Sequence, residues 1–181
     1  MSLNIGAAFS EKVPIYGYLD KENQQSVKIR ENNIEISIDF PINLPPPHRI
    51  RLGYKPDLKY GININIKNSE KDPIEVLFVP PILNAENKNS IRPYSLSKFS
   101  EGKGQDQYGG WKFDHFEYDL TKPNISESLM PNKLLQLSSR FEIPADIQIV
   151  EWPFKLTIKI GGQEKKIQKS FLLHKANLTG Y

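Results

Sequence analysis

The chain of 181 residues contains no cysteine. This absence excludes a disulfide framework, a thiolate metal site and a cysteine nucleophile. Long apolar runs are also missing. A membrane-spanning helix needs about 20 apolar residues in a row, and no run in the sequence is nearly as long, so no membrane span is predicted. Excess charge is small, because 24 basic residues stand against 21 acidic ones and leave a net charge of +3. Such a balance does not indicate a nucleic acid as the partner.

Several familiar catalytic motifs are absent as well. The sequence has no glycine loop before Lys and Ser/Thr, no Gly-x-Ser-x-Gly elbow and no His-Glu-x-x-His pair. No cofactor is therefore predicted, and a non-enzymatic role is favoured over an enzymatic one. A pair of carboxylates of the kind that glycosidases use has no sequence signature and stays open.

The N-terminus shows no basic segment followed by an apolar one, so no signal peptide is predicted. If an export signal has been removed, we expect a bacterial cell-envelope protein, periplasmic or surface-exposed, before a cytoplasmic one.

The clearest pattern that is present is a strict alternation over residues 34–44, where every even position is apolar and every odd position is polar or proline. Successive side chains of a strand point to opposite faces, so the pattern predicts a strand with one face in the core and one in water. A shift of one residue would expose the whole apolar row, which fixes the register.

Similar short runs recur at 60–67, 74–79 and 154–160, with turn residues between them. Gly161-Gly162 is a two-residue hairpin turn in which both residues can take positive φ. The pattern predicts an all-β, two-sheet antiparallel β-sandwich, with an immunoglobulin-like arrangement as first choice and a jelly roll as second. The length favours one domain over 1–181.

Three segments depart from this pattern. Residues 1–12 are predicted to be a loosely ordered arm, and residues 84–110, rich in Asn, Lys, Ser and Gly, are predicted to be a long loop. Residues 126–139 are predicted to contain the one short helical segment, with Ser126 as its N-cap. A change of the apolar face along 111–120 predicts a bulge near Asp114-His115.

One candidate site is polar. His115, Glu117 and Asp119 share a strand face at i, i+2 and i+4, where an imidazole and two carboxylates could hold a divalent metal or act as an acid–base pair. The alternative is the wet face of a half-buried strand. Because no fourth ligand is signalled, no metal is predicted and the three residues are weak candidates.

A second candidate site is aromatic. Tyr108 and Trp111 follow a glycine-rich segment, and further aromatics come after them at 113, 116 and 118. Aromatic faces flanked by polar groups are typical of sugar-binding sites, whereas the alternative is that these rings fill the core. The residues proposed as ligand-binding are Tyr108, Trp111, Asp114 and His115.

A third pattern is basic, formed by Lys155, Lys159, Lys165, Lys166 and Lys169 on the C-terminal hairpin. Lysines on an exposed strand edge hinder edge-to-edge association, and this interpretation is favoured over nucleic acid binding. The overall prediction is a non-enzymatic binding module that recognises another protein through its loops. The alternative is a carbohydrate-binding or glycan-acting domain that uses the Trp111 region.

Overall fold

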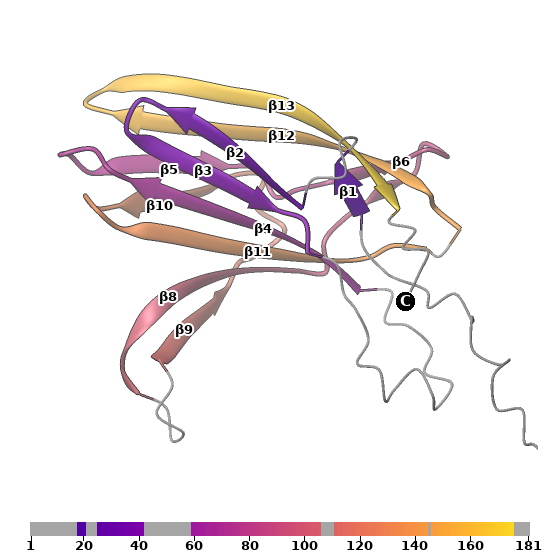
Figure 1. Ribbon diagram of the computed structural model, residues 1–181, viewed down its shortest axis with the longest axis horizontal. Helices are drawn as coiled ribbons and strands as arrows, with labels where there is room; N and C mark the ends of the chain where they lie inside the picture. Colours follow the sequence, from indigo (N-terminus) through magenta and orange to yellow (C-terminus); the bar gives the residue numbers. More distant parts are fainter. Residues whose placement is uncertain (1–17, 21–24, 42–58, 106–110, 145, 176–181) are drawn as a thin grey trace, which may run out of the picture.

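The computed structural model describes residues 18–20, 25–41, 59–105, 111–144 and 146–175 (Figure 1). These residues form strands and contain no helix, so the predicted all-β class is confirmed. No helix in these ranges is available to cross a membrane. The strands are β1 (Tyr18–Asp20), β2 (Ser26–Glu31), β3 (Ile34–Asp39), β4 (Lys59–Asn68), β5 (Ile74–Phe78), β6 (Leu83–Ala85), β7 (Ser90–Ile91), β8 (Ser95–Gln105), β9 (Trp111–Glu117), β10 (Ile125–Leu129), β11 (Leu134–Glu142), β12 (Ile149–Ile160) and β13 (Gln163–Lys175).

The strands form two antiparallel sheets. A seven-stranded sheet has the order β1-β13-β12-β5-β10, with β6 paired to β12 and β7 paired to β6. A six-stranded sheet has the order β2-β3-β4-β11-β8-β9. Figure 1 shows the two sheets as layers, with β12 and β13 in one layer and β3, β4 and β11 in the other. The molecule is thus an antiparallel β-sandwich, as the sequence predicts, while the choice between immunoglobulin-like and jelly-roll topology stays a prediction.

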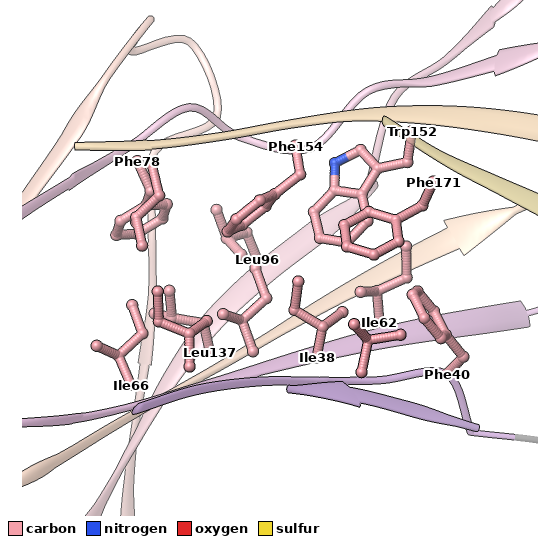
Figure 2. Close-up of a cluster of buried hydrophobic side chains, with 14 of the residues drawn as sticks. Ile38, Phe40, Ile62, Ile66, Phe78, Leu96, Leu137, Trp152, Phe154 and Phe171 are labelled. Carbon is pink, nitrogen blue, oxygen red and sulfur yellow. The ribbon is translucent and has the colours of Figure 1, made fainter. Parts of the chain in front are cut away.

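The core lies between the layers. Ile34, Ile36 and Ile38 of β3 are at most 1% exposed, as the alternation predicts. Figure 2 shows side chains of the two sheets facing each other, with Phe154, Trp152 and Phe171 on one side and isoleucines of the six-stranded sheet on the other. The rings of Phe40 and Phe171 meet edge to face across the gap, with centroids 5.7 Å apart. Each such buried side chain stabilises the fold by about 1.5–3 kcal/mol.

The predicted helix over 126–139 is wrong. This segment forms β10, which pairs with β5, and β11, which pairs with both β4 and β8. Between them the chain turns at Asn132, whose φ is +60°. Leucine favours helices intrinsically, but Leu135, Leu137 and Phe141 recur with a period of two and lie in the core, so tertiary pairing overrides the local preference.

The predicted long loop over 84–110 is also wrong in its described part, which contains the end of β6 and all of β7 and β8. The first half of β8 pairs with β11, and β8 pairs with β9 from Ser97 to Gln105, with a register shift after Glu101. Strand preference depends on context. The second half of β8 has no pairing with β11, so it lies beyond the central part of the sheet and does not need the regular apolar face of a core strand. Residues 106–110 and the predicted arm at 1–12 lie outside the described residues.

The β8–β9 hairpin curves away from the two layers (Figure 1). Its register is regular from Phe113 to Glu117, and the irregularity lies opposite, between Glu101 and Gln105, not at Asp114-His115 as predicted. An ion pair between Lys98 of β8 and Glu127 of β10, 2.8 Å long, joins the base of the hairpin to the other sheet.

Candidate functional site

The outward side of the six-stranded sheet is polar and hollowed. Alternate residues of its central strands point away from the core because their neighbours, such as Ile38, Ile64 and Leu137, fill it. A hollow of about 470 Å³ lies over this side and is lined chiefly by amide, hydroxyl and carboxylate side chains with one aromatic ring. The residues concerned are Asp39 of β3, Asn63 and Asn65 of β4, Gln136 and Ser138 of β11, and Phe99 of β8.

A second hollow of about 300 Å³ adjoins the first. Both are lined by Asn63 and Ser138, so the two hollows meet at these paired residues of β4 and β11. The second hollow adds Tyr94 and Arg140, both exposed. We call the two hollows together the outer-face groove.

Hydrogen bonds fix one wall of the outer-face groove. The amide nitrogen of Asn65 donates to Asp39 Oδ2 at 2.9 Å and to Ser37 Oγ at 3.2 Å. Its amide oxygen accepts a hydrogen bond from Gln136 Nε2 at 3.3 Å. Asn65 therefore has its donor and acceptor groups occupied, and its role is to hold Asp39 and Gln136 in place.

The centre of the groove is different. The side chains of Asn63 and Ser138, and the guanidinium of Arg140, form no hydrogen bond or ion pair with any other described residue. These groups lie on paired strands, since Asn63 is directly opposite Ser138 in the β4–β11 register. An amide, a hydroxyl and a cation thus face the groove with their hydrogen-bonding capacity unused within the described chain.

Aromatic and acidic groups border the groove on the β8–β9 side. The ring of Phe99 lies against the imidazole of His115, with centroids 5.1 Å apart and planes tilted by 31°. His115 Nε2 lies 3.3 Å from Glu117 Oε1, and Glu117 also accepts hydrogen bonds from the hydroxyls of Ser95 and Ser97. The side chains of His115 and Glu117 are about half exposed, at 48% and 54%.

The structure brings together only part of the predicted polar trio. His115 and Glu117 share the outward face of β9, as the strand periodicity predicts. Asp119 instead accepts hydrogen bonds from the hydroxyl and amide of Thr121, at 2.7 and 3.0 Å, which hold the pKa of its carboxyl below the usual range. Within the described ranges, no three His, Asp or Glu side chains are grouped so as to hold a metal ion.

The predicted aromatic site is described only in part. Tyr108 lies outside the described residues, and Trp111 and Asp114 belong to β9 with side chains that are not described. Phe116 is 56% exposed, lies opposite Lys98 in the strand register and packs on Tyr118 at 5.3 Å. Lys98 points to the other sheet through its ion pair with Glu127, so Phe116 is on the face of β9 away from His115.

Sequence reasoning did not single out the residues at the centre of the groove. The sequence pattern indicates only that these residues lie on the solvent-exposed face of half-buried strands; they are Asn63, Asn65, Gln136 and Ser138. One signal was available: asparagine is depleted in strands, yet it occupies two successive outward positions of β4. Because asparagine does not favour strands, its presence at these positions indicates a role of its side chain on the surface.

No family model matches the chain, and no curated protein matches its sequence. Solved structures show a loose resemblance at low identity. A structural-genomics target has a TM-score of 0.41 at 11% identity, covering 84% of this chain and 95% of its own. A family 123 glycoside hydrolase from Clostridium perfringens has a TM-score of 0.39 at 15% identity, and the match covers 67% of this chain and 22% of the hydrolase. An uncharacterized β-sandwich protein from Clostridium difficile has a TM-score of 0.31 at 16% identity, and the match covers 78% of this chain and 89% of that protein. These resemblances concern the fold and assign no function.

Proposed function

We propose that the protein is a non-enzymatic binding module whose outer-face groove binds a glycan. The single observation behind this proposal is the pair Asn63 and Ser138, which lies at the centre of both hollows with no hydrogen bond to the rest of the described chain. Unused amide and hydroxyl groups on a rigid sheet are suited to the hydroxyls of a sugar, since each sugar hydroxyl both donates and accepts.

The size and preorganisation of the groove support this proposal. The larger hollow, about 470 Å³, falls within the roughly 300–1,000 Å³ typical of small-molecule sites. The bonds that Asn65 makes to Asp39 and Gln136 hold polar groups in position before a ligand arrives. Binding to a site that is already ordered costs less conformational entropy.

The aromatic residues at the border support the same class of ligand. Tyr94 is 46% exposed, and Phe99 contributes its ring to the wall of the larger hollow. The apolar C–H face of a pyranose ring can pack on such rings while its hydroxyls reach Asn63 and Ser138. The proposed sugar site thus lies on the sheet over β4, β8 and β11, and it does not depend on Trp111, whose side chain is not described.

The proposal is tested with a glycan microarray that includes neutral and uronic-acid oligosaccharides. Wild-type protein is compared with the variant Asn63→Val/Ser138→Val, which keeps strand-forming side chains but removes both free polar groups. Loss of two hydrogen bonds predicts binding at least about tenfold weaker. The matched control is Thr157→Val, which makes the same kind of change on the central strand β12 of the other sheet.

Binding by wild-type protein and the control, with loss in the double variant, supports the proposal. Absence of binding to any glycan, or equal binding by the double variant, contradicts it. Thermal melting of all three proteins shows whether the substitutions leave the fold intact.

Recognition of a protein through loops is the second candidate function. The stretch 84–110 can no longer serve as the recognition loop, because its described part consists mainly of strands. Three short connections at one end of the sandwich instead surround a separate hollow, and this hollow favours recognition of a protein segment.

A further inference from the structure

A hollow of about 350 Å³ lies at the end of the sandwich, apart from the outer-face groove. It is formed by the β5–β6 connection, the residues between β7 and β8, and the turn that follows β9. These segments meet because Phe78, the last residue of β5, pairs with Ile125, the first of β10, while Tyr118 donates its amide to Leu96 of β8. We call this hollow the loop-end pocket.

The walls of the loop-end pocket are apolar and stiff. Val79, Ile82 and Leu120 contribute aliphatic surface, and three prolines line the pocket as well. Proline fixes its own φ, so these connections lose little freedom when a ligand binds. Val79 is 42% exposed, which leaves apolar surface open to an incoming group.

Two cations also line the pocket, and they differ in how they are paired. Lys122 lies close enough to Asp119 to help lower the pKa of that carboxyl. Arg92 is exposed and forms no ion pair or hydrogen bond with the other described residues. Among the described residues, the guanidinium of Arg92 is therefore a positive group without a partner beside an apolar hollow. A guanidinium pairs best with a carboxylate, through two parallel hydrogen bonds.

We infer that the loop-end pocket binds the C-terminal residue of a partner polypeptide. The apolar side chain of that residue enters the hollow between Val79, Ile82 and Leu120, and its terminal carboxylate pairs with Arg92. A C-terminal residue carries an apolar side chain and a carboxylate on the same Cα atom. This matches a pocket whose lining contains both apolar side chains and Arg92. The exposed side chain of Val79 offers contact to the residue before it.

Fluorescence polarisation tests the inference directly. The probes are fluorescein-labelled peptides Gly-Ser-Gly-Ser-X with X as Val, Leu, Ile or Phe, each with a free carboxylate and as the C-terminal amide. At least one free-carboxylate peptide is expected to bind, with the amide at least tenfold weaker, since the ion pair with Arg92 is lost. Arg92→Gln is expected to weaken binding of the free-carboxylate peptide to the level of the amide.

The matched control is Arg30→Gln, which removes an exposed arginine on β2 and is expected to bind as wild type does. Binding of no peptide overturns the inference, as does equal binding of acid and amide, or unchanged binding by Arg92→Gln. If N-acetyl-leucine binds while no peptide does, the ligand is a free apolar acid and the polypeptide partner is refuted. None of these results bears on the outer-face groove, so the two proposals fail separately.

Discussion

Among single residues, Asn68 ties the two sheets together. It ends β4, is fully buried, and donates from its side-chain amide to the carbonyls of Asp72 and Leu129, each at 3.0 Å. Its amide oxygen accepts the N–H of Glu70 at 2.9 Å. Because Leu129 belongs to β10 of the opposite sheet, while Glu70 and Asp72 belong to the turn after β4, this one side chain joins β4 and its following turn to the other layer.

We therefore predict that Asn68→Ala lowers the free energy of unfolding by about 2–4 kcal/mol, because it leaves buried backbone groups without partners. Urea denaturation measures this change. Asn124→Ala is the control, since Asn124 is exposed and its side chain has no hydrogen bond within the described chain. Equal effects of the two substitutions would refute the role given to Asn68.

A second residue-level prediction concerns pH. The hydroxyl of Tyr118 donates to Glu127 at 2.6 Å, and burial together with this bond raises the pKa of Tyr118 above its usual value. The unfolded chain then releases this proton from about pH 10, while the folded chain keeps it, so stability present at neutral pH is lost as the pH rises. In the Tyr118→Phe variant, the free energy of unfolding should fall less steeply as the pH rises.

Urea denaturation of wild type and Tyr118→Phe between about pH 8 and pH 11.5 checks this, because the difference between the two curves removes the contribution of the other tyrosines. Parallel curves over that range would show that the hydroxyl of Tyr118 titrates alike in the folded and unfolded chains.

At the level of elements, β13 presents an edge that needs protection. It pairs with β12 along its whole length, but β1 covers its other side only at Leu173–Lys175 within the described residues. Lys165, Lys166 and Lys169 are exposed on the uncovered part. Lys165 also pairs with Glu31 of β2, which joins the edges of the two sheets. Exposed lysines on such an edge oppose pairing with another chain.

Replacing these three lysines with threonine, which favours strands, is expected to cause concentration-dependent association beyond that of the wild type. Light scattering coupled to size-exclusion chromatography measures the effect. Replacing Lys67, Lys71 and Lys133 with threonine, in the central strand β4 and in the turns after β4 and β10, is the control for the loss of three charges away from a sheet edge. An unchanged mass for the β13 variant would reject the protective role.

The success of sequence-based prediction varied by element for physical reasons. The alternation in β3, β4 and β12 predicts strands correctly, because a buried face on a long central strand leaves a strong period of two. The turn at Gly161-Gly162 is confirmed by φ values of +53° and +84°. The strand β8 could not be predicted, since its pairing with distant β11 has no local signal.

The site shows the same limit. The period of two places His115 and Glu117 on one face, as predicted, but which strands lie beside them depends on sheet order. The register that sets Asn63 opposite Ser138, and Ser138 opposite Ser97, joins segments about 75 and 41 residues apart in the chain. A single sequence contains no direct record of such pairings.

On the scale of the whole molecule, the residues that stabilise the sandwich are distinct from those of the proposed binding site. The aromatic cluster of Trp152, Phe154 and Phe171 and the facing isoleucines hold the layers together in the interior (Figure 2). The outward face of the six-stranded sheet contributes little to that core and can hold free polar groups without loss of stability. Function on such a rigid scaffold depends on the surface residues and not on the fold.

The most direct test of the outer-face groove as a glycan site is a titration of ¹⁵N-labelled protein with the glycan that binds most strongly on the array, followed by amide chemical shifts. We predict that the largest shifts fall on β4, β8 and β11 around Asn63 and Ser138, and that they vanish in Asn63→Val/Ser138→Val. Shifts confined to the loop-end pocket or to the seven-stranded sheet, or no shifts at saturating glycan, would contradict the assignment of the outer-face groove as the binding site.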